Sequence, residues 1–138
     1  MHERGPSAPA GPRWLYLHGF ASGPSSAKGT RLAEHYARRD VRLERLDLRR
    51  PSMEHLRLSA MIAHVRDAIG DARDRAVVFG SSLGGLTAAR VAEEDARVCA
   101  LVLLAPAFRI AERWRARLGP EWEQRFYFSA SESSVSAW

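Results

Sequence analysis

Residues 77–85 place a serine between two glycines at the end of a short apolar run, in the order V-V-F-G-S-S-L-G-G. A helix-like segment, residues 86–92, follows at once. A strand that turns directly into a helix needs a tight bend, and Gly80 and Gly84 leave room where a Cβ would not fit. Ser82 would then be exposed at a helix N-terminus, where backbone N–H groups favour negative charge. This G-x-S-x-G pattern is the sequence form of a nucleophile elbow.

Apolar runs and helical periodicities alternate along the rest of the chain. The runs predict strands at 14–17, 41–48, 76–79 and 98–105, and the periodicities predict helices that begin at Ser25 or Ser26, at Pro51-Ser52 and at residue 83, with a weaker one at 111–118. We expect an α/β fold with a parallel sheet of about four strands and helices on both faces.

The four predicted strands differ in pattern. Glu44 and Arg45 interrupt the alternation of the second strand, which suits an edge position. The fourth strand, 98–105, is a continuous apolar run, which is expected of a strand covered on both faces.

Length and composition limit the function classes. The 138 residues suggest one domain, which we divide into a disordered lead-in at 1–12, a folded part at 13–128 and an unstructured tail at 129–138. The net charge of +5 comes almost wholly from arginines spread along the chain, without a nucleic-acid-binding motif, so we expect no nucleic-acid partner. No signal peptide or membrane span is evident, and a cytoplasmic location is the expectation.

Cys99 is the only cysteine and lies within the fourth apolar run. We expect a buried core thiol. A single cysteine excludes an intrachain disulfide and a cysteine-based zinc site, and we expect neither a metal nor a cofactor.

Three nucleotide-binding interpretations fit poorly. A dinucleotide fingerprint needs glycine where Ser82 stands, and a P-loop needs lysine where Leu86 follows Gly85. The segment 23–30 has its lysine and glycine in the wrong order for a P-loop. None of these three phosphate sites is predicted.

A second motif, L-Y-L-H-G-F at residues 15–20, ends the first predicted strand. A loop after an early strand supplies one backbone N–H of an oxyanion hole in serine hydrolases of the α/β type, and the residue after the nucleophile supplies the other. Here these donors would be Phe20, or Ala21, and Leu83. His18 precedes the elbow, and we interpret its imidazole as structural.

Together the two motifs resemble the α/β-hydrolase fold, and within it small bacterial esterases with a Leu-His-Gly-Phe strand end and a Gly-Ser-Ser-Leu-Gly-Gly elbow. Ser25-Ser26-Ala27-Lys28 also looks like that group, and the resemblance covers about residues 14–108. It implies Ser82 as nucleophile, Phe20 and Leu83 as oxyanion donors, Gly19, Gly80 and Gly84 as loop and elbow glycines, and a small ester or acyl substrate.

The resemblance also implies an Asp and a His after later strands, which this chain does not match. No histidine follows Ser82, and His2, His35, His55 and His64 lie in the lead-in or on predicted outer helices. We expect Asp95 to be a solvated surface residue, and Glu112, Glu121, Glu123 and Glu132 lack a strand-end context.

We therefore expect a weak or inactive serine esterase, truncated or frameshifted after the fourth strand. The alternatives are a non-catalytic remnant acting as an interaction module, and an acyl-binding or acyltransferase module with the same elbow. Because the resemblance implies further strands beyond 98–105, we also expect that strand to form an exposed edge that favours self-association.

Overall fold

A computed structural model describes residues 11–50, 52 and 56–120 of the chain. The elements follow the order β1 (Arg13–Leu17), α1 (Ala27–Ala37), β2 (Leu43–Leu46), α2 (Leu58–Ile69), β3 (Ala76–Ser81), α3 (Leu83–Glu94), β4 (Val98–Leu104) and α4 (Ile110–Leu118). The four strands form one sheet in the order β2-β1-β3-β4, and every pairing is parallel. The predicted α/β class is confirmed.

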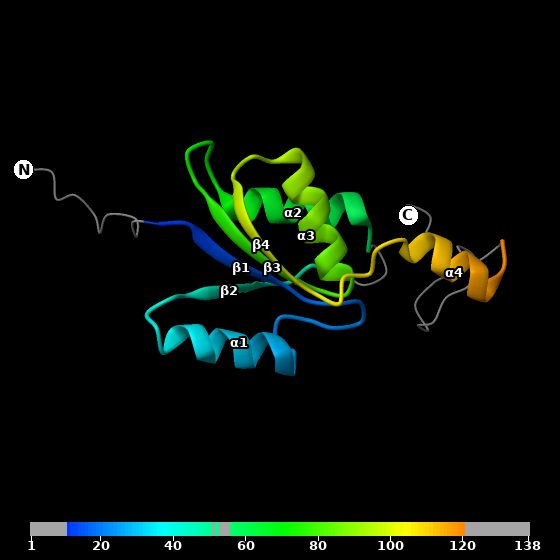
Figure 1. Ribbon diagram of the computed structural model, residues 1–138, viewed down its shortest axis with the longest axis horizontal. Helices are drawn as coiled ribbons and strands as arrows, with labels where there is room; N and C mark the ends of the chain where they lie inside the picture. The colour runs from blue at the N-terminus through cyan, green and yellow to red at the C-terminus, as the bar shows by residue number, and fades with distance from the viewer. Residues whose placement is uncertain (1–10, 51, 53–55, 121–138) are drawn as a thin grey trace, which may run out of the picture.

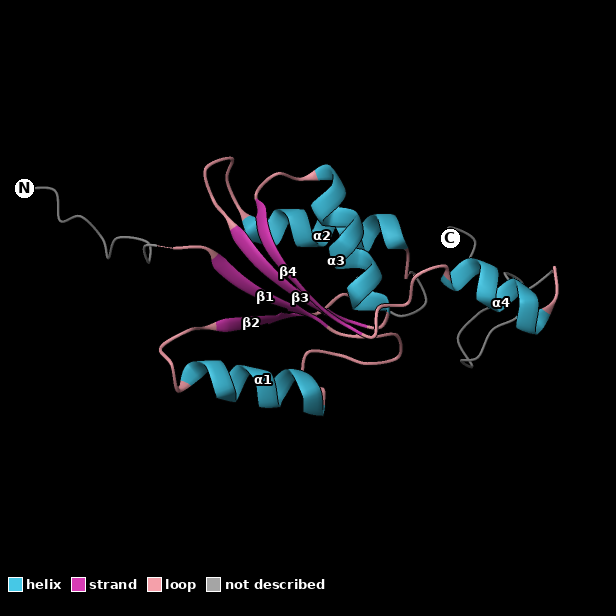
Figure 2. Cartoon of the chain, viewed as in Figure 1, coloured by secondary structure: helices cyan, strands magenta, loops and turns pink. Residues whose placement is uncertain are grey.

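Helices cover both faces of this sheet (Figures 1 and 2). Helix α1 lies on one face, where Tyr16, Leu43, Val77 and Phe79 form a small core. Helices α2 and α3 lie on the other face, over a larger core that includes Leu15, Leu17, Val65, Val78 and Val91. The alternation of side chains along β1 and β3 explains the division, because successive residues of a strand point to opposite faces.

The start of α1 has a side-chain cap, whereas the start of α2 has none. The Ser26 side chain accepts a hydrogen bond from the backbone N–H of Gly29, as an N-cap does. Helix α2 begins at Leu58, after Arg57 in an extended conformation, and not at Pro51-Ser52 as predicted. Part of the predicted start, residues 51 and 53–55, lies outside the described residues.

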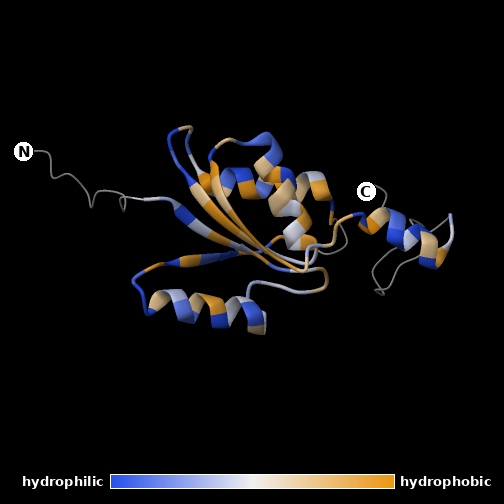
Figure 3. Cartoon of the chain, in the orientation of Figure 1, coloured by the Kyte–Doolittle hydropathy of each residue, from blue (hydrophilic) through white to orange (hydrophobic). Residues whose placement is uncertain are grey.

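Strands β3 and β4 are both largely hydrophobic (Figure 3), but their environments differ. All six residues of β3 are buried, because β3 lies between β1 and β4 and its two faces are covered by α1 and by α2 with α3. Among the described residues, strand β4 ends the sheet, and its residues 99–102 are exposed. The prediction that this run is covered on both faces is wrong. Within the described residues, β2 and β4 are the two edge strands of the sheet, as predicted.

Cys99 lies on this exposed strand and is itself exposed, so the prediction of a buried core thiol is also wrong. Its thiol contacts the Ala76 carbonyl oxygen at 3.3 Å, across the β3–β4 pairing. The hydrophobic run correctly predicted that Cys99 lies on a strand, but it did not predict whether that strand is central or at the edge of the sheet.

Asp95 follows α3 at the opposite end of β4 from the elbow, and its side chain is only 6% exposed. Arg97 donates to this carboxylate at 2.7 Å, and Arg66 lies 3.3 Å from it. The hydrogen bond from Arg97 lowers the pKa of Asp95 to about 2. The expectation of a solvated surface residue is therefore wrong. The carboxylate is buried, and its interactions with the two arginines compensate for the loss of its hydrating water.

The predicted tail 129–138 and most of the lead-in lie outside the described residues. Within the described residues, none of the helices combines the length and apolar character that a membrane span requires.

Candidate active site at the β3–α3 turn

Ser82 stands between the last residue of β3 and the first residue of α3. Its backbone has φ 55° and ψ −118°, and residues other than glycine rarely adopt a positive φ. Such a conformation costs about 1 to 3 kcal/mol and persists where the surroundings enforce it. The predicted strand-to-helix turn at Ser82 is confirmed, including its strain.

Gly80 and Gly84 permit this turn because backbone atoms pass close to both. A Cβ on Gly84 would lie 2.2 Å from the Leu17 carbonyl oxygen, at the end of β1. A Cβ on Gly80 would lie 2.3 Å from the Gly84 carbonyl oxygen. Both distances are far below van der Waals contact, so both positions require glycine.

The backbone of Ser82 is hydrogen-bonded to the last residue of β4 and to the chain just after it. Its N–H donates to the Leu104 carbonyl at 3.0 Å, and its carbonyl accepts from Ala107 N–H at 2.9 Å. The same carbonyl accepts from Gly85 N–H at 2.9 Å, in the first turn of α3. The N–H of Leu83 belongs to that first turn, where a helix offers no internal acceptor, so it can serve an anionic ligand.

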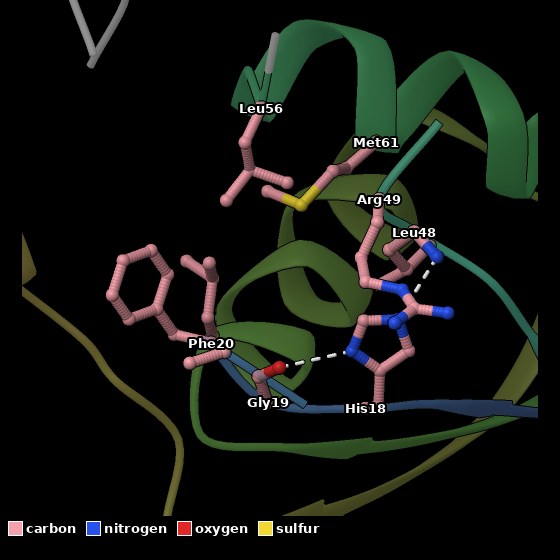
Figure 4. Close-up of a pocket in the computed structure, with 9 residues that line it drawn as sticks. His18, Gly19, Phe20, Leu48, Arg49, Leu56 and Met61 are labelled. Carbon is pink, nitrogen blue, oxygen red and sulfur yellow. Dashed lines mark hydrogen bonds between the residues drawn. The ribbon is translucent and has the colours of Figure 1, made fainter. Parts of the chain in front are cut away.

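The loop after β1 packs directly against the nucleophile candidate. A Cβ on Gly19 would lie 3.3 Å from the Ser82 Cβ and 3.9 Å from its Oγ. Phe20 and Leu83 line the same small pocket of about 10 Å³, together with Ala21, Leu48, Leu56 and Met61 (Figure 4). The two sequence motifs therefore meet at one place, although the convergence of the Phe20 and Leu83 N–H groups on one point stays a prediction.

His18 lies in the wall of this pocket and is 4% exposed. Its two ring nitrogens contact the Gly19 carbonyl and the Leu48 N–H, each at 2.9 Å (Figure 4). Burial lowers the pKa of His18 below its usual value, so the imidazole is neutral at pH 7. These contacts agree with the structural role that its position before the elbow suggested.

Asp47 and Arg49 form an ion pair beside this histidine. Arg49 Nε lies 2.8 Å from Asp47 Oδ1, which is itself 3.8 Å from His18 Nε2. The hydrogen bond from Arg49 lowers the pKa of Asp47 to about 2, so this carboxylate is charged at neutral pH. Its charge is already matched by Arg49, which makes Asp47 a poor proton acceptor for the elbow.

The neighbouring serine, Ser81, has a different environment from Ser82. Ser81 is buried, and Lys28 Nζ donates to its Oγ at 3.0 Å. This contact ties the start of α1 to the end of β3. Sequence reasoning missed it because the two residues are 53 positions apart, although the resemblance had already singled out Lys28.

Among the described residues, the histidines between the first motif and the elbow, His35 and His64, have contacts elsewhere in the structure. His35 packs against Tyr36 on α1, and its ring lies 3.4 Å from Arg39. His64 lies on α2 beside Asp67 and Arg50. Within the described ranges, no cluster of three or more His, Cys, Asp or Glu could hold a metal ion. The absence of a base at Ser82 stays a prediction, and His55 lies outside the described residues.

The comparisons with known proteins agree with the fold. Seven chains of solved structures match, and among them is a crystal structure described as a "Putative hydrolase from Agrobacterium vitis S4". It has a TM-score of 0.65 and 23% sequence identity over 85% of this chain, and the chain spans about half, 53%, of that structure. No curated protein matches the chain. The model of an uncharacterised protein family, UPF0227, matches residues 13–136, and the chain belongs to that family.

Proposed function

We propose that this protein is a serine acyl hydrolase of esterase type, with Ser82 as its nucleophile and a small ester as its substrate. The observation that carries the proposal is the strained backbone of Ser82, with φ 55°, at a strand-to-helix turn enforced by two obligatory glycines. Backbone strain of this kind gathers at functional sites. The hydrolase-like fold of the solved match is consistent with it.

The reaction would proceed through an acyl-enzyme. Ser82 Oγ attacks the ester carbonyl carbon, and the carbonyl oxygen becomes an oxyanion held by the N–H groups of Phe20 and Leu83. The C–O bond to the alcohol breaks as the tetrahedral intermediate collapses, and the serine proton leaves to solvent or with the alcohol. Water then attacks the acyl-serine, releases the carboxylic acid and restores the Ser82 hydroxyl.

The rate should be low within this chain, because no histidine follows Ser82 in its sequence. In subtilisin, loss of the catalytic serine or histidine costs roughly 10⁶-fold in kcat, and roughly 10³-fold catalysis over water survives from the oxyanion hole and binding. We therefore expect acylation by activated esters, whose leaving groups need no general acid, and slow turnover of ordinary esters.

A fluorophosphonate probe tests the proposal on the full chain, with Ser81→Ala and Ser82→Ala as matched variants. We expect slow labelling of the wild type and of Ser81→Ala, located at residue 82 by peptide mass spectrometry, and none of Ser82→Ala. Rapid stoichiometric labelling would show that a base acts on Ser82 and that the expected weakness is wrong. No labelling of folded wild type over a day would overturn the proposal and favour the second candidate.

The second candidate is a non-catalytic interaction module, and the exposed strand β4 favours it. Leu101 and Val102 are each 37% exposed at the end of the sheet. Strand β4, Val98–Leu104, contains no charge and no proline, the residues that usually blunt an edge. We propose a second copy of this chain as the partner, because antiparallel pairing of β4 with itself is two-fold symmetric and closes both edges at once.

A further inference from the structure

The hydrogen bonds of His18 define its tautomer. Leu48 N–H can only donate, so the Nε2 atom that it contacts at 2.9 Å must accept. A neutral imidazole then carries its proton on Nδ1, and this proton points at the Gly19 carbonyl oxygen, 2.9 Å away. His18 thus uses one ring nitrogen to hold the loop after β1 and the other to hold the residue that follows Asp47.

The Gly19 carbonyl matters because of the peptide unit to which it belongs. In a planar trans peptide the C=O of one residue and the N–H of the next point in opposite directions. Gly19 O is held by His18 Nδ1–H and, at 3.2 Å, by Ser22 N–H. Fixing this oxygen therefore also fixes the direction of the Phe20 N–H.

The same peptide unit lies against the nucleophile candidate. Gly19 is close enough that a Cβ there would touch the Ser82 Cβ at 3.3 Å. A rotation of the Gly19–Phe20 peptide would turn the Phe20 N–H away and bring a carbonyl oxygen toward the site. An oxygen in that position would repel a developing oxyanion, so the direction of this one peptide decides whether the loop helps or hinders acylation.

We infer that His18 is a positioning residue of the oxyanion hole, whose Nδ1–H holds the Gly19 carbonyl so that the Phe20 N–H faces the acyl oxygen bound at Ser82. The inference rests on the proposed function. His18 does not contact the reacting atoms itself. Its charge state is set by its surroundings, since it is buried and both Asp47 and Arg49 lie beside it.

Two substitutions separate the two hydrogen bonds of the ring. In His18→Asn the side-chain amide can place an N–H near the position of Nδ1, but it offers nothing at the position of Nε2. In His18→Gln the longer side chain can offer its carbonyl oxygen to Leu48 N–H, but it offers no donor to Gly19. Each variant keeps one bond, so a purely structural role predicts a similar loss of stability in both and no difference in reactivity.

The measurements are the acylation rate of Ser82 by p-nitrophenyl acetate and the affinity for phenylboronic acid, which forms a tetrahedral adduct with a reactive serine. Both are made at a temperature where thermal melting shows each variant folded. We expect His18→Gln to lose about tenfold to hundredfold in both quantities, less than the loss of a whole oxyanion donor, and His18→Asn to stay within about threefold of wild type. Equal reactivity of the two folded variants would overturn the inference while leaving the proposed function intact.

A measurement on the wild type needs neither folding of a variant nor activity. The ¹⁵N chemical shifts of the His18 ring report which nitrogen carries the proton, and we expect the Nδ1–H form at pH 7. The Nε2–H form would overturn the inference. If wild type forms neither an acyl-serine nor a boronate adduct, the proposed function fails, and the positioning role fails with it.

Discussion

Strands β3 and β4 are adjacent, parallel and similarly apolar, yet one is buried at every residue and the other is exposed along most of its length. Val78 and Leu101 are partners in the β3–β4 register and make the contrast plain. Val78 is inaccessible to solvent, whereas Leu101 is 37% exposed. The difference lies in their place in the sheet: β3 is central, with α1 on one face and α2 and α3 on the other, whereas β4 is the edge strand of the described residues.

The two strands also differ in how many elements pack against them. Strand β3 leads into the strained turn at Ser82 and is held by β1, α3 and the loop after β1. Strand β4 supports that turn through Leu104 O but exposes its other edge. The candidate site thus lies at the end of a central, buried strand, whereas the association that we propose would take place at the edge of the sheet.

The largest effect is expected where β3 enters the elbow. In Gly84→Ala the new Cβ would lie 2.2 Å from Leu17 O and 2.6 Å from His18 O, and backbone atoms cannot move aside cheaply. We expect a loss of about 4 kcal/mol or more in the free energy of unfolding, measured by urea denaturation. Gly23→Ala is the control, because its Cβ would meet only the flexible side chain of Arg49 at 3.0 Å. Equal stability of the two variants would show that the close contact at residue 84 is wrong.

A smaller difference in unfolding free energy is expected between matched substitutions on β3 and on β4. Val78→Ala removes buried methyl groups and should cost about 2 to 3 kcal/mol of unfolding free energy. Leu101→Ala removes more atoms but from a partly exposed position, so we expect a loss below about 1 kcal/mol. A loss at Leu101 as large as that at Val78 would show that β4 is covered in solution, for example by a second copy.

The smallest effect on stability is expected at the edge itself. Val102→Lys places a charge on an exposed residue of β4 and should change the unfolding free energy by less than about 1 kcal/mol. It should nevertheless reduce self-association, measured by sedimentation velocity over a range of concentrations, because a charged edge resists pairing.

Ala37→Lys, an exposed position at the end of α1, adds the same charge away from the edge and is the control. Self-association that persists in Val102→Lys, or that falls equally in the control, would exclude pairing through β4. A wild-type protein that stays monomeric at high concentration would also exclude pairing through β4.

The sequence by itself determined the alternation of strands and helices, the parallel sheet and the turn at Ser82. These features depend on local rules: hydrophobic period, serine caps, and glycines at 80 and 84 where no Cβ fits. The charged residues Glu44 and Arg45 likewise indicated that β2 lies at an edge, since charge on a strand is tolerated best where water reaches it.

Only the tertiary structure decided which apolar residues are buried. The same hydrophobic pattern describes β3 and β4, and the strand order β2-β1-β3-β4 leaves Cys99 and Leu101 exposed. Asp95 is buried because Arg66, distant in sequence, and Arg97 meet it there. The bonds of His18 to Leu48 and of Lys28 to Ser81 span 30 and 53 positions. Contacts of such separation depend on how the chain returns to the sheet, and no local pattern encodes that path.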